Sequence, residues 1–297
     1  MTRSDVDFFS ILCYHCYDVI VMPKFKNEDY IEILTDCVHD IFYTNTSYRG
    51  KIAQIRMYSE IIVRKLIDFN PDEQLTLGNP KVLQAVRNLD NGDYYEKCIL
   101  ALKDDADKYY ATNSCSHSKI REKITQHDYE SIHDNFLNLL SCIFIQYFTK
   151  YKFGSNSSIM TFFSCLPPII RYKVLYYLYA NDNTNVSIID KLTLATMKAF
   201  NPDTAQKWVD EEQDHLLSIP ACSPKFASMA KSLGLAENMY ECCCEKISFE
   251  LSGKYHTIEE AKPAYDLNKE RYDTVEDSIR EFRDLMDFVF IGRKNEE

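Results

Sequence analysis

The sequence predicts an all-α fold, and two observations support this prediction. Glycine accounts for only 7 of the 297 residues and tyrosine for 21, a composition that disfavours a turn-rich β fold. Long uninterrupted segments place apolar residues three and four positions apart, which is the spacing of an amphipathic helix. With 45% hydrophobic and 27% charged residues, the chain can bury a substantial core in one large domain or two smaller ones.

Residues 1–47 are predicted to form an N-terminal helical extension. Two amphipathic segments, Asp5–Val21 and Asn27–Tyr43, have the spacing of helices. Between them, the proline of MPKFKNED breaks the pattern, and we expect Asn27 to cap the second helix. The loop TNTSYRG closes this extension and leads into the next segment.

Residues 48–153 are predicted to form a bundle of four helices. The first lies in KIAQIRMYSEIIVRKLIDF, where Arg56 and Glu60 stand four positions apart on one face, in an order that suits an ion pair. The breaker NPDEQLTLGNP separates this helix from a short one, Lys81–Leu89. The turn DNGD then precedes a third helix over about 94–110.

The fourth helix of this bundle is predicted to be the longest, at about 26 residues. Thr125 and Asp128 have the spacing of a helix cap, in which the Thr side chain accepts from free N–H groups of the first turn. Behind the cap, one apolar stripe runs from Ile132 to Phe148. His127, in the first turn, falls on the opposite, polar face.

Residues 156–297 are predicted to form a C-terminal, mostly helical domain that follows a hinge at KFGSNSS. Three segments of helical period, LPPIIRYKVLYYLYA, VSIIDKLTLATMKAF and DTAQKWVDEEQDHLL, are separated by Pro and Asn–Asp breaks. A short strand or hairpin is expected in EKISFELSGKYHTIEEA, and a polar helix over about 273–288 ends the chain. The apolar start of this domain favours packing on the middle bundle or on another subunit.

The net charge of −11 argues against a generally basic surface that coats nucleic acid. The charge is uneven, because residues 51–155 contain fourteen Lys/Arg and fourteen Asp/Glu. A local basic site in this middle region is therefore compatible with the composition. The N-terminal segment does not have the order of a signal peptide, and no apolar run near it could span a membrane. We expect a cytoplasmic protein without a membrane partner.

Two cysteine clusters, Cys13–Cys16 and Cys242–Cys244, are interpreted as reduced thiols. A zinc site needs a second pair of ligands at a matching spacing, and three adjacent cysteines point in different directions. We therefore expect no metal and no cofactor.

The middle of the chain resembles the HEPN superfamily, small four-helix bundles of prokaryotic toxins, defence proteins and other RNA-cleaving or nucleotide-binding proteins. AQIRMYSEIIVRKLIDF looks like the first HEPN helix, with Arg56 followed by Glu60 one turn on. LGNPKVLQAVRNL is similar to the short second helix, and TNSCSH resembles the Asn-to-His element that precedes the last helix in one branch. The resemblance covers residues 48–153 and implies a HEPN-like bundle there.

In catalytic members of the family, an Arg precedes a His by four to six intervening residues, and two protomers bring both motifs into one cleft. Two alignments with this chain are open. In the first, His117 is the base and Asn113 its polar companion, and the expected Arg is missing. In the second, Arg121 and His127 form the pair, with five residues between them. His suits proton transfer near neutral pH, and Arg suits phosphate, so the reaction requires no metal.

The resemblance therefore implies a metal-independent endoribonuclease that acts on RNA as a homodimer, in anti-phage defence or a toxin system. Its site would hold Arg121, His127, His117 and Asn113, with Arg56 and Glu60 in support. The alternative is a catalytically degenerate HEPN-like protein that binds a nucleotide or a partner protein. The C-terminal domain offers a surface for such a protein partner.

Overall fold

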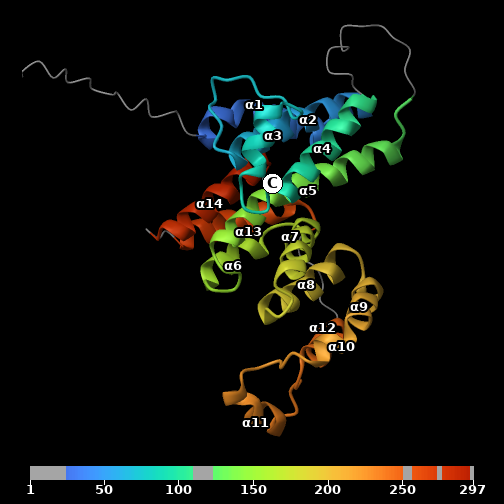
Figure 1. Cartoon of the computed structure of the whole chain (residues 1–297), viewed down its shortest axis with the longest axis vertical. Helices are drawn as coiled ribbons and strands as arrows, with labels where there is room; N and C mark the ends of the chain where they lie inside the picture. The colour runs from blue at the N-terminus through green and yellow to red at the C-terminus, as the bar shows by residue number, and fades with distance from the viewer. Residues whose placement is uncertain (1–24, 110–122, 250–255, 273–275, 295–297) are drawn as a thin grey trace, which may run out of the picture.

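The computed structural model describes residues 25–109, 123–249, 256–272 and 276–294 (Figure 1). Over these residues the protein is all-α, as predicted, and its only β element is one isolated antiparallel bridge between Pro220 and Asn238. The first half of the chain contains the 3-10 helix η1 (Asn27–Tyr30), α1 (Ile31–Val38), the π-helix η2 (His39–Tyr43), α2 (Tyr48–Leu66), α3 (Pro80–Arg87), α4 (Gly92–Tyr109) and α5 (Gln126–Lys150). The second half contains α6 (Ser157–Ser164), α7 (Pro168–Asn181), α8 (Val186–Ala199), α9 (Pro202–Glu211), α10 (Gln213–Leu217), α11 (Pro224–Ser232), α12 (Met239–Ser248), α13 (Ile258–Arg271) and α14 (Asp277–Phe290).

The helices predicted in the first half are present where the structure describes them. The segment Asn27–Tyr43 forms one continuous run of η1, α1 and η2. The predicted Asn27 cap is wrong, because Lys26 is the N-cap residue of η1 and makes no side-chain cap bond. The Asn27 side chain instead donates to the Asp284 carbonyl of α14 at 2.9 Å and accepts from Lys65 at 2.9 Å. The helix predicted over Asp5–Val21 lies outside the described residues.

The strand expected in EKISFELSGKYHTIEEA is also wrong over the part that the structure describes. Its first residues end α12, and its last residues begin α13. Thr257 caps α13 through a capping box with Glu260, a signal that is visible in the sequence as Thr-x-x-Glu.

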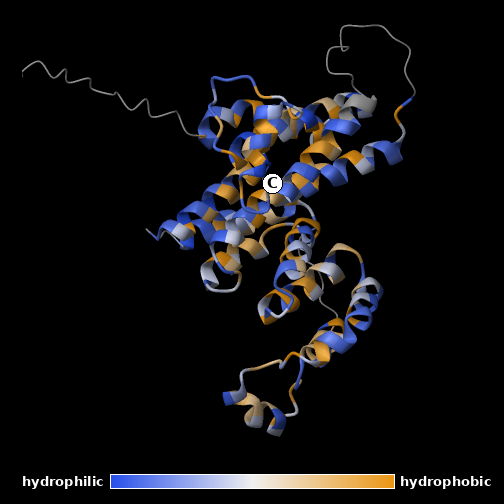
Figure 2. Ribbon diagram, in the orientation of Figure 1, coloured by the Kyte–Doolittle hydropathy of each residue, from blue (hydrophilic) through white to orange (hydrophobic). Residues whose placement is uncertain are grey.

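Helices α2, α4 and α5 form the centre of the first half, and their apolar faces meet in the core. Figure 2 shows that hydrophobic and hydrophilic residues occupy different faces of these helices. The fully buried Tyr58 of α2 lies against Phe136 of α5, with ring centroids 5.1 Å apart. Such close apolar packing supplies most of the stability of amphipathic helices.

The last helix returns to this first half, although more than a hundred residues separate them. The Tyr147 hydroxyl of α5 donates to the Ser278 carbonyl at 2.9 Å, and Lys150 pairs with Glu281 at 2.7 Å. Phe288 of α14 is fully buried and contacts the Tyr58 ring. The predicted boundaries of an extension over 1–47, a bundle over 48–153 and a domain over 156–297 stay a prediction, but the end of the chain packs on helices of the first half.

Helices α7, α8, α9 and α12 pack together in the second half, and α7 also packs on α5. At that contact, Lys173 of α7 pairs with Asp134 at 2.7 Å and donates to Asn138 at 2.8 Å. The buried apolar residues form one core cluster from η1 to α14. Among the helices that the structure describes, none is long and apolar enough to cross a membrane.

Candidate functional site

A cleft of about 710 Å³ lies where the N-terminus of α2 meets the chain that leads into α5. The lining comes from the loop before α2, from the first residues of α2 and from the two residues before the cap of α5: Asn45, Thr46, Ser47, Tyr48, Arg49, Lys51, Lys123 and Ile124. Three of these side chains are cationic, and among the described residues that line the cleft none is acidic. The cleft is thus a positive region on a chain of negative net charge.

Hydroxyl groups hold the loop before α2 in place. Thr44 and Thr46 both donate to the Asp40 carbonyl, at 3.0 and 3.1 Å. Ser47 is the N-cap of α2, and its hydroxyl accepts from the Gly50 amide at 3.2 Å. These bonds fix the direction in which α2 begins, so the side chains of its first turn are preorganised around the cleft.

The start of α2 has an unusual charge pattern. Its first turn contains no acidic side chain, and Arg49 and Lys51 follow the cap directly. The N-terminus of a helix carries partial positive charge, so cations there disfavour the helix and acidic residues are normally preferred. The start of α2 therefore combines a helix N-terminus with cationic side chains, a combination that suits an anion.

An aromatic pair stands beside the cations. Tyr48 stacks on Tyr129 of α5, with ring centroids 5.3 Å apart and an interplanar angle of 23°. The Lys51 ammonium lies 6.0 Å from the centroid of the Tyr129 ring. Burial raises the pKa of Tyr129, so this phenol stays neutral at physiological pH. Tyr48 keeps 36% of its surface exposed, and an exposed ring beside cations suits a nucleotide base next to its phosphate.

The predicted catalytic residues are placed only in part. Asn113, His117 and Arg121 lie outside the residues that the structure describes, so both alignments stay predictions. His127 is exposed in the first turn of α5. It does not line the cleft, but Lys123, four positions earlier, does. The structure thus brings the segment just before His127 against the start of α2.

The capping box predicted for α5 is confirmed. The Thr125 hydroxyl accepts from the Asp128 amide at 3.2 Å and donates to the Asp128 carboxylate at 2.7 Å, which also accepts from the Thr125 amide at 2.9 Å. The carboxylate next to His127 is therefore engaged in the cap. The carboxylate keeps its negative charge beside His127, where it would repel a phosphate.

Arg56 and Glu60 form the ion pair that their spacing suggests, with 3.4 Å between Arg56 Nε and Glu60 Oε1. Both side chains are partly buried. Burial raises the pKa of Glu60, and the opposing effect of Arg56 is smaller. Arg56 is seven residues, or about 10 Å along α2, from Arg49, and neither member of the pair lines the cleft. The pair therefore acts as a local contact of α2 in this structure.

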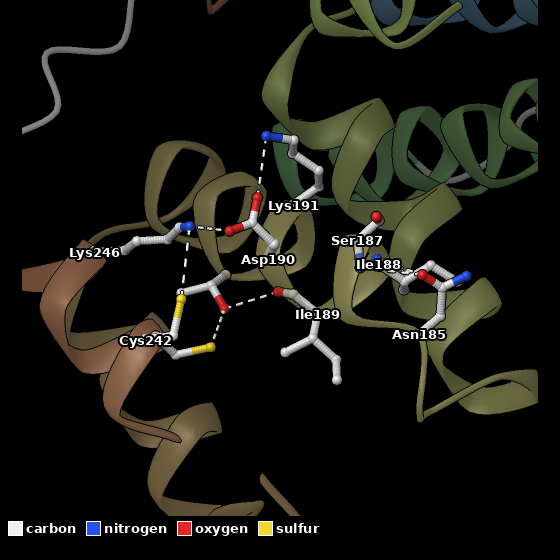
Figure 3. Close-up of polar contacts among 10 residues, drawn as sticks. Asn185, Ser187, Ile188, Ile189, Asp190, Lys191, Cys242 and Lys246 are labelled. Atoms are coloured by element: carbon white, nitrogen blue, oxygen red, sulfur yellow. Dashed lines mark hydrogen bonds and ion pairs between the residues drawn. The ribbon is translucent and has the colours of Figure 1, made fainter. Parts of the chain in front are cut away.

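The described residues contain no group of three or more His, Cys, Asp or Glu side chains arranged to hold a metal ion. Cys242 and Cys243, part of one predicted thiol cluster, are free thiols. Cys242 lies on α12, beside its contact with α8 (Figure 3). Cys243 accepts from the Thr193 hydroxyl at 3.1 Å, and Lys246 pairs with Asp190. These contacts join the two helices. Cys13 and Cys16 lie outside the described residues.

The sequence prediction did not identify Arg49, Lys51 and Lys123 as site residues. The sequence pattern places Arg49 in a loop that closes the N-terminal extension, and Lys51 at the start of a core helix. A signal was present, because a Ser cap is followed by two cations and no acidic residue. The contribution of Lys123 has no local signal, since it depends on the packing of α5 against α2.

Comparisons of the chain with protein-family models, with curated proteins and with solved structures gave no match. The resemblance to HEPN proteins thus rests on sequence motifs alone.

Proposed function

We propose that the cleft between α2 and α5 binds the phosphate backbone of RNA, and that the protein is a HEPN-like, metal-independent endoribonuclease of a defence or toxin system that works as a homodimer. The observation that supports the proposal is the set of three cations, Arg49, Lys51 and Lys123, gathered at a helix N-terminus beside stacked tyrosines. This set adjoins the chain segment that carries the predicted catalytic residues.

The proposed reaction is an internal transfer within RNA. The 2′-hydroxyl loses its proton to a histidine, His127 or His117, while its oxygen attacks the neighbouring phosphorus. The bond from phosphorus to the 5′-oxygen breaks, and this oxygen takes a proton from water or from the second histidine. The products are a 2′,3′-cyclic phosphate and a 5′-hydroxyl. Arg121 and the cations of the cleft stabilise the charge on the crowded phosphorane.

A second candidate is a catalytically degenerate HEPN-like protein that binds RNA or a nucleotide without cleaving it. One observation favours it: the described lining of the cleft contains phosphate-binding cations but no histidine. Binding and cleavage are therefore measured separately.

Binding is tested with a fluorescently labelled single-stranded RNA in an anisotropy titration at several salt concentrations. We expect the triple variant Arg49→Ala/Lys51→Ala/Lys123→Ala to lose at least about 100-fold in affinity, since each contact between a cation and a phosphate is worth on the order of 1 kcal/mol or more. The salt dependence should also become shallower, by about 0.7 per lost phosphate contact.

The matched control is Lys81→Ala/Lys207→Ala/Lys225→Ala, which removes the same charge at exposed positions outside the cleft. Equal affinity of the two triple variants would exclude the cleft as the binding site.

Cleavage is followed with the same RNA in EDTA. Loss of cleavage in Arg121→Ala and His127→Ala with binding retained supports the enzyme and the second alignment, and loss in His117→Ala alone selects the first. A wild-type protein that binds without cleaving identifies the degenerate candidate.

A further inference from the structure

Helices α4 and α5 pack antiparallel, and two hydrogen bonds between side chains fix their register. Asn91, directly before α4, donates to the Thr149 hydroxyl of α5 at 2.8 Å. Near the other end of α4, the Asp105 carboxylate accepts from the Asn135 amide at 2.8 Å. The two bonds are fourteen residues apart on both segments, so the register is kept over about 21 Å.

Two cysteines stand midway between these bonds, in the same register. Cys98 lies seven residues after Asn91, and Cys142 lies seven residues before Thr149. Seven residues make about two helical turns, so each cysteine is on the same side of its helix as the residues of the two bonds. The register therefore places the two thiols opposite each other. Both are free and buried, and Cys98 keeps 7% of its surface exposed.

The two thiols also share a hydrogen bond, in which Cys142 donates to Cys98. The Cys142 sulfur lies 3.4 Å from the Asn138 carbonyl oxygen as well, so its one hydrogen serves either acceptor. The bond from Cys142 lowers the pKa of Cys98. A bond from the Tyr94 hydroxyl and the ammonium groups of two nearby lysines act in the same direction, and together they outweigh the opposite effect of burial.

Other buried thiols of this chain behave differently. Burial raises the pKa of Cys37 and of Cys243 to about 12, and burial also raises the pKa of Cys142. The thiolate is the form of cysteine that attacks an oxidant, and redox-sensitive cysteines combine a lowered pKa with a neighbouring thiol. Cys98 is therefore the more reactive member of the pair, and Cys142 is the thiol that reacts second.

We propose that Cys98 and Cys142 form a disulfide when hydrogen peroxide oxidises the protein, and that this bond locks α4 to α5 in their native register. The Cys98 thiolate attacks one peroxide oxygen, the O–O bond breaks and hydroxide leaves, so that Cys98 becomes a sulfenic acid. The Cys142 sulfur then attacks the Cys98 sulfur and loses its proton. The S–O bond breaks, and the hydroxide that leaves takes this proton to form water. In total, the two thiols lose two electrons and the peroxide gains them.

The disulfide would join the two helices that border residues 110–125, the segment that carries the predicted catalytic residues. Neither cysteine lines the cleft at the start of α2, so the inference does not rest on the proposed function. A disulfide stabilises a protein mainly by restricting the unfolded chain, and here the native register already brings the two sulfurs into contact.

The test is peptide mapping of the full chain after oxidation. Wild-type protein is reduced, freed of reductant and treated with a few equivalents of hydrogen peroxide, and its remaining thiols are then blocked in urea. A tryptic digest places Cys98, Cys115 and Cys142 in different peptides, so mass spectrometry without reduction identifies each bond. We expect the Cys98 peptide joined to the Cys142 peptide, with the mass of the two less that of two hydrogen atoms.

Two variants separate the roles of the thiols. In Cys142→Ala the sulfenic acid on Cys98 has no second thiol beside it, and we expect dimedone to trap it. In Cys98→Ala we expect Cys142 to stay a thiol under the same conditions. Cys37→Ala is the matched control, since it removes a buried thiol of α1 and should form the disulfide to the wild-type extent. Circular dichroism shows whether each variant keeps its helix content.

Oxidation of the wild type should also raise the midpoint of urea unfolding by about 1 M, and dithiothreitol should reverse this shift. Three outcomes overturn the proposal: a peroxide-treated wild type without the Cys98–Cys142 peptide, a bond from Cys98 to Cys115 or another cysteine in its place, or an oxidised protein with a lower midpoint than the reduced one. All three are measured on the wild type, so they hold even where a substitution alters folding.

Discussion

Lys65 of α2 is a largely buried cation between aromatic rings. Its ammonium donates to Asn27 at 2.9 Å and lies 5.0 and 5.2 Å from the ring centroids of Phe25 and Phe288. Burial lowers the pKa of Lys65 to about 8, and nearby carboxylates such as Asp284 oppose this shift only in part. The charged form is therefore less favoured in the folded protein than in the unfolded chain.

This shift predicts a stability that depends on pH. The ordinary pKa of 10.5 applies to the unfolded chain, which therefore binds more protons than the folded protein between about pH 8 and pH 10.5. We expect the free energy of unfolding of the wild type, relative to Lys65→Met, to be constant below this window and to rise by about 3 kcal/mol across it. Urea unfolding of both proteins at a series of pH values measures the difference, and a difference that stays flat would show that Lys65 has an ordinary pKa.

Two glycines with positive φ follow the ends of helices, Gly234 (φ 65°) after α11 and Gly292 (φ 70°) after α14. An L-residue costs about 1 kcal/mol in that conformation. A Cβ at position 292 would also lie 2.7 Å from the Thr35 Cα, whereas at position 234 nothing lies within 4 Å. The close approach of backbones at Gly292 holds the end of α14 on α1.

We expect Gly292→Ala to lower the free energy of unfolding by about 3 kcal/mol or more, because it adds a clash with backbone to the conformational cost. Gly234→Ala should lower it by about 1 kcal/mol at most. Thermal and urea unfolding, followed by circular dichroism, give both values. Equal effects would contradict the contact between position 292 and Thr35.

At the scale of single elements, local signals in the sequence predicted most of the helices of the first half. The apolar spacing of α2 and α5 and the Thr125–Asp128 capping box depend only on residues a few positions apart. They can therefore be identified from the sequence without knowledge of the fold. Helix α13 was missed because its mixed polar sequence and internal Pro263 weaken the helical pattern. The helix forms despite the proline in its second turn, because Thr257 caps it and because Ile258, Ala261 and Tyr265 are buried in the core.

The cap of α5 also positions the candidate site, since it stands between Lys123 and His127. We expect Thr125→Ala to lower the free energy of unfolding by about 1 kcal/mol and to weaken RNA binding, because the first turn of α5 loses its fixed start. Thr125→Ser keeps the hydroxyl and should restore both properties. A loss in Thr125→Ser equal to that in Thr125→Ala would show that the methyl group, not the cap, is important.

At the scale of the whole molecule, one core cluster extends from η1 to α14. Phe288 connects α14 to Phe25 and Tyr58, while Trp208, the single tryptophan of the chain, lies in α9 and contacts Tyr179 with a centroid distance of 5.4 Å. Trp208 fluorescence therefore reports on the second half, and circular dichroism reports on all helices.

We expect Phe288→Ala to lower the free energy of unfolding by about 3 to 5 kcal/mol. Since the core is continuous through α5, α7 and α8, the midpoints measured by Trp208 fluorescence and by circular dichroism should shift together. A fluorescence midpoint that stays at the wild-type value would instead show that the two halves unfold independently, as separate domains would.

The sequence predicts the position of His127 along the chain, but it does not predict the cleft formed by the three cations. His127 was placed correctly in the first turn of a capped helix, since cap and spacing are local. The meeting of Arg49 and Lys51 with Lys123 was not predicted, because more than seventy residues lie between them and only packing brings them together. The roles of Asn113, His117 and Arg121 stay predictions.

The amino-acid sequence by itself determined that this chain is helical, where most helices begin and end, and that a long capped helix follows the predicted motif. These features depend on hydrogen bonds and apolar spacing between residues a few positions apart. Only the tertiary structure decided that α14 closes the first half and that three cations meet at the start of α2. Such features depend on which surfaces bury each other, and burial is a property of the folded chain as a whole.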